Sequence, residues 1–249
     1  MFVQIRKRQP LIHCITNYVA APFQANGLLA IGAAPIMADE EKEIEEVVRM
    51  ADALLINIGT VNERTKMAMM RAGKEANKHQ IPVVLDPVGV GVSEFRRETV
   101  QQLLESIDFA LIRCNEGELA AIANVDWVQK GVDKGQGSMN LEKEAKRIAQ
   151  LYNCFVIVSG EQDYLTDGDR SCSVTGGHIK MTQVTGTGCL LSAICAATLT
   201  VKAVNMNHMQ EVLHRYKLVG SLADKPNQHM GDYQISILNE LHRLSMEGV

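Results

Sequence analysis

A glycine-rich turn leads into a strongly apolar helix pattern at residues 184–191, which read Val-Thr-Gly-Thr-Gly-Cys-Leu-Leu. Glycines in such a turn let successive backbone N–H groups converge, and the start of a helix adds about half a positive charge. Together these features favour an anion site suited to a phosphoryl group. The alternative is an ordinary turn before a core helix, and the motif alone does not decide between the two.

Cys189 opens this predicted helix. A helix N-terminus lowers the pKa of a thiol there and favours the thiolate, which makes Cys189 a candidate reactive group. The alternative is a small packing residue, because cysteine is often buried. The chain has six cysteines and is neither short nor loop-rich, so we expect free thiols in a reducing compartment.

Polar residues that follow two other apolar runs are further candidates. Asp86 could hold Mg²⁺ directly or through water, or only shape a turn. Arg113 could contact phosphate oxygens with its planar guanidinium. Asn115 and Glu118 begin the next predicted helix, where an N-cap and a first-turn carboxylate also serve the helix itself.

The apolar runs that would position these residues alternate with longer helical patterns. They lie at residues 35–38, 53–58, 82–85, 109–112 and 155–158. Their lack of strict alternation is typical of strands buried on both faces of a parallel sheet. Thr60 and Glu63 offer a capping box for a helix that reaches toward His79. Residues 163–181 predict short strands at an antiparallel edge, and helix follows from Thr187.

Open parallel sheets bind ligands beyond the carboxyl ends of their strands. We therefore expect the polar residues at the strand ends to cluster along one rim. They are Asn57, Asp86, Arg113, Ser159 and Glu161. The glycine-containing stretch at residues 130–140 reads as a loop within the domain, so the sequence predicts a single α/β domain over residues 1–249.

Composition excludes several classes of function. The 249 residues carry a net charge of -4 and 4% aromatics, which argues against nucleic-acid binding by bulk charge or by stacking platforms. The first ten residues lack the apolar core of a signal peptide, and the stretch 189–201 is short of the roughly 18–20 residues of a membrane span. We expect a cytoplasmic protein without nucleic-acid or membrane partners.

Two familiar site patterns are absent from the sequence. No P-loop motif occurs, and no Gly-x-Gly-x-x-Gly follows the first strand, which weakens a dinucleotide-binding interpretation. The adjacent His13 and Cys14 have no second ligand pair at metal-binding spacing.

Taken in order, the motifs resemble those of the hydroxyethylthiazole kinases of thiamine salvage. The matching stretches are residues 16–19, 26–37, 55–60, 85–89, 112–115, 130–133, 159–161 and 184–191. The resemblance implies a ribokinase-like, three-layer α/β/α fold with a mostly parallel central sheet. It also implies an enzyme that uses ATP and Mg²⁺ to phosphorylate the hydroxyethyl group of 4-methyl-5-(2-hydroxyethyl)thiazole.

The resemblance also implies roles for the ATP side of the site. Asp86 and Glu118 match the carboxylates for Mg²⁺ and phosphate. Arg113 and Ser159 match ATP-contacting positions, although a threonine is more usual at the second. The γ-phosphate would bind at residues 185–188, with Thr185 and Gly188 at its ends.

For the alcohol side, the resemblance implies contacts from Asn17, Met37 and Gly186. The family trimer places this pocket between subunits, so we expect a homotrimer in which a neighbouring subunit's Asn17 and Met37 side faces the alcohol. Cys189 matches the family's cysteine, where related sugar kinases carry a catalytic aspartate. Phosphoryl transfer depends mostly on positioning and charge neutralisation, so Cys189 could be either a weak base or a positioner.

The C-terminal part departs from the family pattern. Residues 229–233 read His-Met-Gly-Asp-Tyr where a Gly-Pro-Gly-Ser-Phe-like segment is usual, which puts nucleotide affinity or preference in question. Two alternatives follow. One is a ribokinase-like NAD(P)H-hydrate dehydratase, which Cys189 in place of aspartate and the motif at residues 16–17 disfavour. The other is a non-catalytic thiazole-binding paralogue.

Overall fold

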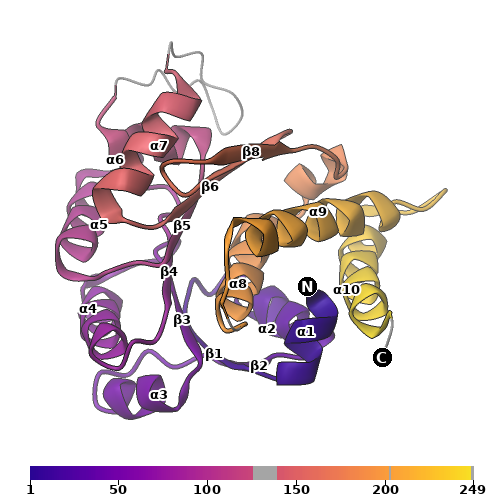
Figure 1. Cartoon of the computed structure of the whole chain (residues 1–249). Coiled ribbons are helices and arrows are strands. Elements are labelled where there is room, and N and C mark those ends of the chain that lie inside the picture. The colour runs from indigo at the N-terminus through magenta and orange to yellow at the C-terminus, as the bar shows by residue number, and fades with distance from the viewer. Residues whose placement is uncertain (126–138, 202, 248–249) are drawn as a thin grey trace.

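The computed structural model describes residues 1–125, 139–201 and 203–247. They form one eight-stranded sheet with helices on both faces (Figure 1). In space the strands follow the order β2-β1-β3-β4-β5-β6-β7-β8. Their bounds are β1 Leu11–Ile15, β2 Ala34–Ile36, β3 Ala53–Asn57, β4 Val83–Asp86, β5 Leu111–Asn115, β6 Phe155–Ser159, β7 Asp163–Thr166 and β8 Ser171–Val174. Neighbours from β2 to β6 pair in parallel, and β7 and β8 add an antiparallel edge.

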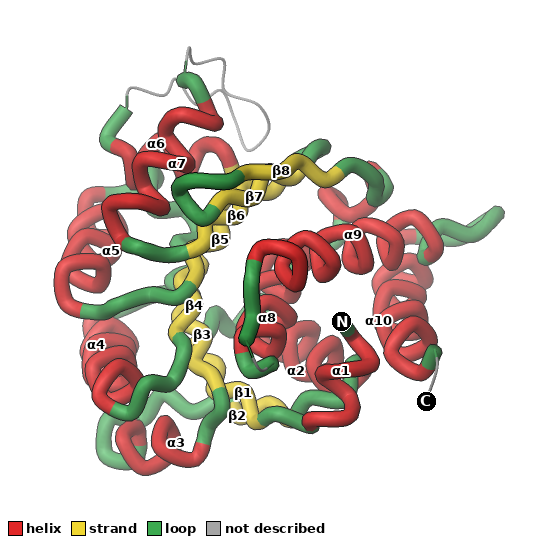
Figure 2. The backbone as a smooth tube through the Cα atoms, viewed as in Figure 1, coloured by secondary structure: helices red, strands yellow, loops and turns green. Residues whose placement is uncertain are grey.

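The helices form two layers, with the sheet running between them (Figure 2). One layer consists of α3 Ile44–Met50, α4 Glu63–Lys78, α5 Glu94–Ser106, α6 Glu116–Ala123 and α7 Leu141–Tyr152. The other consists of α1 Phe2–Arg8, α2 Ala21–Ala30, α8 Thr187–Leu199, α9 Met206–Leu222 and α10 Met230–Met246. A short 3-10 helix, η1 Ile179–Gln183, precedes α8. This confirms the predicted three-layer α/β/α architecture.

Each face of the sheet has its own apolar core. On β3, Leu55 packs toward the α8 side while Leu54 and Ile56 pack toward the α4 side. Strands of this kind are apolar throughout because both faces are covered, as the sequence predicted. Helix α8 is buried along its length from Leu190 to Leu199, between the sheet, α2 and α9. An all-round apolar helix is typical of this central position.

Three local predictions need correction. Strand β1 was missed, because His13 and Cys14 interrupt its apolar run. Helix α4 is capped by Asn62 with Thr65, and Thr60 instead accepts a hydrogen bond from the Tyr18 N–H (3.3 Å). Strand β5 does not end at Arg113 but continues to Asn115, as its register with β6 shows.

Other sequence predictions are confirmed. Asn115 caps α6 in a reciprocal box with Glu118, residues 163–174 form the antiparallel edge, and the six cysteines are free thiols. Among the helices described, none has the length and apolarity needed to cross a membrane. The stretch 130–133, which carries part of the resemblance, lies outside the described residues.

Candidate functional site

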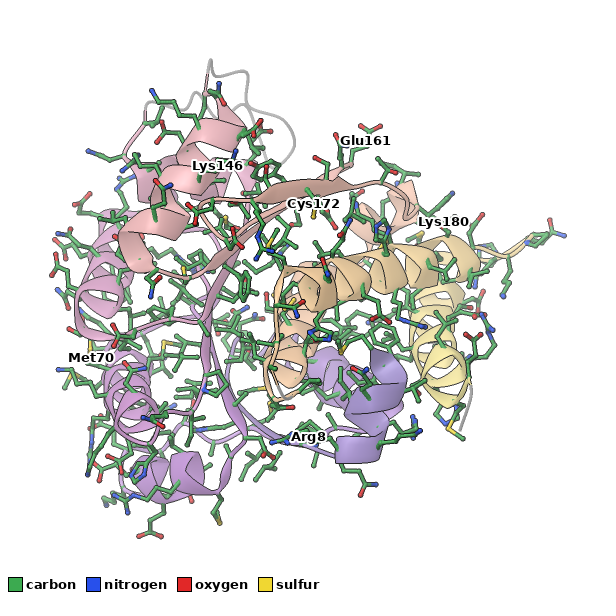
Figure 3. All side chains as sticks on the ribbon, viewed as in Figure 1. Arg8, Met70, Lys146, Glu161, Cys172 and Lys180 are labelled. Carbon is green, nitrogen blue, oxygen red and sulfur yellow. The ribbon has the colours of Figure 1, made fainter. Side chains whose placement is uncertain are left out.

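The carboxyl ends of the parallel strands bring the predicted polar residues together. Asn57 and Asp86 are register partners at the ends of β3 and β4, and Asn57 Nδ2 donates to Asp86 Oδ2 at 2.6 Å. Asn115 and Ser159 are partners at the ends of β5 and β6. Glu161 is the exception, because its side chain is exposed and points away from the sheet (Figure 3).

Helix α8 begins at the same rim. Gly186 is its N-cap residue with φ of 90°, a left-handed conformation that favours glycine. The first main-chain bond of the helix runs from the Leu190 N–H to the Gly186 carbonyl at 2.8 Å. Within the described part of the chain, no acceptor meets the N–H groups of Thr187, Gly188 and Cys189. The predicted anion site therefore has its donors at the exposed start of a buried helix.

Arg113 lies against this helix start. A Cβ at Gly188 would sit 2.6 Å from both Nη1 and Nη2 of Arg113, so only glycine allows this approach. Nη2 donates to Ser159 Oγ, and Nη1 lies 3.6 Å from Asp86 Oδ1. The guanidinium thus joins the ends of β4 and β6 to the anion site.

Two buried polar atoms at this point have no hydrogen-bond partner among the described residues. They are Asp86 Oδ1 and Arg113 Nε. Asp86 has 0% of its surface exposed, and its other oxygen, Oδ2, accepts from both Asn57 and Ser192. Buried polar atoms without a hydrogen-bond partner are rare in folded proteins. Two such atoms, on oppositely charged side chains beside a helix N-terminus, therefore indicate a ligand site.

Burial and charge both act on the ionisable groups here. Burial raises the pKa of Asp86, although the charge of Arg113 and hydrogen bonds from Ser192 and Asn57 oppose the rise. Burial and the charge of Asp86 raise the pKa of Glu118. Burial alone would lower the pKa of Arg113, but the charges of Asp86 and Glu118 raise it overall. Arg113 therefore remains charged and stabilises two nearby carboxylates.

Cys189 differs from the sequence prediction. Burial, followed by the charge of Asp86, raises the pKa of its thiol to about 11, so the expectation of a lowered pKa is wrong. The helix N-terminus and Arg113 do not compensate for the loss of hydration of a thiolate this deep in the site. At neutral pH Cys189 is therefore a protonated thiol.

Asn17 lies on the other side of Cys189. Its Oδ1 accepts from the Ala20 N–H (2.8 Å), which fixes the amide orientation, and its Nδ2 donates to Asn57 Oδ1 (2.8 Å) and to Cys189 Sγ (3.4 Å). Asn17 therefore belongs to the same site as Cys189 of its own chain. Whether Asn17 also faces an alcohol bound beside a neighbouring subunit stays a prediction.

The remaining predicted residues are more peripheral. Thr185 is exposed, and a Cβ at Gly186 would lie 3.1 Å from Ala20 Cβ, so this turn packs on the start of α2. Met37 follows the edge strand β2 at the same rim and is 39% exposed. Its role at the alcohol site stays a prediction.

Sequence reasoning missed two buried residues that hold Cys189 and Asp86 in place. Gln24 donates from Nε2 to the Cys189 carbonyl at 2.8 Å. Ser192 donates from Oγ to Asp86 Oδ2 at 2.9 Å, from one turn along α8. A polar residue among the apolar residues of a mostly apolar helix was the available signal for both.

The carboxylates fit a magnesium ion. No cluster of three or more His, Cys, Asp or Glu exists in the described residues, but Mg²⁺ usually takes only one or two carboxylates plus water and phosphate oxygens. Asp86 Oδ1 has unused lone pairs. Glu118 accepts the N–H groups of Gly89 and Asn115 at 2.9 and 2.8 Å, which fixes the orientation of its carboxylate, and the charge of Asp86 acts on it. Hard oxygen donors of this kind suit Mg²⁺ rather than a softer metal.

Solved structures with this architecture define its class. The chain is similar to a ribokinase-like superfamily protein from Enterococcus faecalis, with a TM-score of 0.69 and 11% identity over 96% of this chain and 88% of that chain. Similarity at this identity shows the fold, which is ribokinase-like. With the anion site and its charged pair at the strand ends, the molecule is a kinase of this fold class.

Closer relatives identify the family. The model of the hydroxyethylthiazole kinase family matches residues 2–247. A hydroxyethylthiazole kinase of Lysinibacillus sphaericus is 58% identical over 100% of this chain and 97% of its own length, and one of Haemophilus influenzae is 48% identical over 99% and 94%. The solved Pyrococcus horikoshii hydroxyethylthiazole kinase has a TM-score of 0.88 at 33% identity, covering 99% of this chain and 92% of that chain. The chain belongs to the hydroxyethylthiazole kinase family.

Proposed function

We propose that this enzyme transfers the γ-phosphoryl group of ATP to the hydroxyethyl group of 4-methyl-5-(2-hydroxyethyl)thiazole, a reaction of thiamine salvage. The observation that carries the proposal is that Asp86 Oδ1 and Arg113 Nε, which lie beside the free N–H groups of α8, have no hydrogen-bond partner among the described residues. An anion-binding helix start, a fixed arginine and a free carboxylate oxygen are the parts that phosphoryl transfer needs.

The transferred group would lie between the α8 start and Arg113. In the reaction the alcohol oxygen forms a bond to the γ-phosphorus, the bond to the β–γ bridging oxygen breaks with its electron pair remaining on ADP, and the alcohol proton passes late to an oxygen of the transferred phosphoryl group. The N–H groups of Thr187, Gly188 and Cys189, with Arg113, stabilise the negative charge on the transferring oxygens. Ser159 holds the guanidinium in this position.

The raised pKa of Cys189 supports a positioning role. A thiol that remains protonated at neutral pH does not take the alcohol proton before the bond to phosphorus forms. In a loose transition state the alcohol loses its proton late, so an early base is not required. Asn17 and Gln24 fix Cys189 beside the place where the alcohol would bind.

Asp86 and Glu118 would hold Mg²⁺, with Asp86 Oδ1 as the free oxygen. When bound, the ion supplies positive charge to the phosphate oxygens. Asn57 and Ser192 keep Asp86 Oδ2 occupied, so that Oδ1 remains the oxygen for ligands.

The assembly and location remain part of the proposal. Exposed apolar side chains at Tyr18, Val19 and Met37 lie at or just beyond the ends of β1 and β2. Such side chains suit a subunit interface, and we propose a homotrimer in which Met37 contributes to an alcohol site shared between subunits. Free thiols throughout the chain support a cytoplasmic location.

A coupled assay for ADP release tests the proposal. The purified enzyme is given MgATP and a panel of small alcohols, including hydroxyethylthiazole and hydroxymethylpyrimidine. We expect ADP release to depend on hydroxyethylthiazole and on Mg²⁺, and to stop when the ion is chelated. Thiazole binding by calorimetry without ADP release would support the non-catalytic alternative, and conversion of hydrated NADH would support the dehydratase.

A further inference from the structure

The turn between β6 and β7 lies next to the anion site and is held from two sides. Ser159, at the end of β6, accepts from Arg113. The next residue, Gly160, donates its N–H to Asp163 Oδ1 at 3.0 Å, which closes the turn from within. Asp163 is almost completely buried, so this contact is shielded from water.

The second support comes from the middle of α9. Lys217 is only 7% exposed, and its Nζ donates to the carbonyls of Gly160 (2.7 Å) and Glu161 (3.0 Å) and lies 3.0 Å from Asp163 Oδ1. An ammonium group has three N–H donors; two have carbonyl acceptors here, and the ammonium is also ion-paired with Asp163. Lys217 therefore has no donor left for a ligand, and it acts on the site only through the turn.

Fixing these two carbonyls also fixes the peptide N–H groups that follow them. A planar trans peptide directs its N–H opposite to its C=O, so the N–H groups of Glu161 and Gln162 point away from Lys217. Neither N–H has an acceptor among the described residues. Adjacent backbone donors of fixed direction form an anion-binding surface.

Helix α9 is bonded to the anion site as well as to this turn. Tyr216, next to Lys217, donates its hydroxyl to the Thr187 carbonyl in the first turn of α8 at 2.7 Å. The chain after β8 also packs on Lys217, since a Cβ at Gly177 would lie 3.1 Å from Lys217 Cδ. One turn of α9 thus sets the distance between the β6–β7 turn and the α8 start.

We propose that α9 positions the nucleotide half of the site, and that Lys217 is the positioning residue that orients the turn at residues 159–162 toward ATP. The proposal rests on the kinase activity proposed above. Lys217 does not touch the reacting atoms, so it affects nucleotide binding rather than the transfer step.

Lys217→Met is the direct test. We expect the KM for ATP to rise about tenfold or more, and calorimetric ADP affinity to fall by a similar factor, because oriented donors are lost. The kcat at saturating ATP and the KM for the thiazole alcohol should each change less than about threefold, because the alcohol half is untouched. A folded Lys217→Met enzyme with wild-type ADP affinity would overturn the proposal.

A second, smaller change keeps the proposal testable, because Lys217→Met leaves the buried Asp163 without its ion-pair partner and destabilises the fold. Tyr216→Phe removes only the hydroxyl bonded to Thr187. Thr99→Val is a control outside α9: the hydroxyl of Thr99, on α5, is also buried and donates to a carbonyl, that of Phe95, at 2.7 Å.

We expect Tyr216→Phe to raise the KM for ATP about threefold and Thr99→Val to leave it unchanged, each with a modest loss in thermal stability. Equal KM values in the two variants would overturn the role of α9. Failure of the proposed function gives a different result. If the wild-type enzyme binds ADP but releases no ADP from ATP and the thiazole alcohol, the kinase reaction is contradicted, whereas the role of Lys217 in nucleotide binding is not.

Discussion

The two halves of the rim hold their functional groups in different ways. Around Asp86, side chains bond to side chains: Asn57 and Ser192 both donate to one carboxylate oxygen, and Asn17 donates to Asn57. Around Ser159, a side chain from a distant helix bonds to backbone, since Lys217 holds the carbonyls of Gly160 and Glu161. The first half fixes side-chain orientation, and the second fixes the path of the main chain.

The difference indicates how each half will respond to change. In the Asp86 half, a substitution removes a charge or a donor from the reacting region and should lower kcat. In the Ser159 half, a substitution loosens a turn and should raise the KM for ATP. Arg113 contacts both halves. Substitution of Gly188, the glycine that lets Arg113 approach α8, should therefore change both kcat and the KM for ATP.

The largest effect is expected for Asp86→Asn. The amide has the size of the carboxylate but no charge, so the free oxygen facing Arg113 can no longer support a metal ion. We expect kcat to fall by about 10³-fold or more, as for loss of a principal electrostatic group. Steady-state kinetics measure this, with thermal melting as the control for folding. Retention of a tenth of the activity would contradict the central role of Asp86.

Gly188→Ala should have the next largest effect. The new methyl group would meet both terminal nitrogens of Arg113 at 2.6 Å and displace the guanidinium from Ser159. We expect kcat/KM for ATP to fall about 100-fold, which is the scale for losing one stabilising donor.

A matched control for Gly188→Ala lies at the start of another helix. Gly231 is the second residue of α10, as Gly188 is of α8, and a Cβ there would meet nothing within 4 Å. Gly231→Ala should leave kcat at saturating ATP unchanged. If both alanine variants behave alike, the close approach of Arg113 has no functional importance.

Cys189→Ala should have a moderate effect and a diagnostic pH dependence. The thiol pKa of about 11 lies above its ordinary value, so the thiol stays protonated as pH rises from 6 to 9. A base with that pKa would make kcat rise about tenfold per pH unit over this range, whereas a positioning thiol leaves kcat flat.

We therefore expect Cys189→Ala to lose about tenfold in kcat, with a pH profile parallel to that of the wild type. Rate measurements between pH 6 and 9 on both enzymes provide the comparison. A folded but inactive Cys189→Ala enzyme, or a tenfold slope in the wild type alone, would assign the cysteine the role of base.

The smallest effect is expected for Ser192→Ala. Asp86 Oδ2 loses one of two donors, and Asn57 still holds it, so kcat should fall about threefold. Ser245→Ala is the control, because Ser245 is equally buried but lies on α10 and bonds to Arg6. Both variants should lose similar thermal stability, and only Ser192→Ala should change kcat.

The sequence predicted the Asp86 half better than the Ser159 half, for a physical reason. Asp86, Arg113 and Ser159 lie on strands whose apolar runs are visible in the sequence, and parallel pairing brings their ends together. Lys217 lies on α9, and its contact with Gly160 spans 57 residues of sequence. No local pattern marks a lysine that will be buried by a turn so far away in the chain.

Two of the corrected predictions, the pKa of Cys189 and the cap of α4, also have clear physical causes. The pKa of Cys189 was predicted from its place at a helix start, but the depth of the site and the charge of Asp86 depend on tertiary packing. The capping of α4 was assigned to Thr60, yet the extended backbone at Asn62 makes that residue the cap. In both cases the kind of local interaction was predicted correctly, a thiol at a helix start and a capped helix, but the burial or backbone conformation that decides it was not.

Helix α8 connects the anion site directly to the core. Its first turn would receive the ligand, while the rest of the same helix, from Leu190 to Leu199, is buried between the sheet, α2 and α9. The site therefore cannot loosen on its own, because movement of the helix start requires repacking of the core on that face of the sheet. Binding of ATP is thus coupled to folding of this core, and bound ATP would raise the free energy of unfolding of the whole protein.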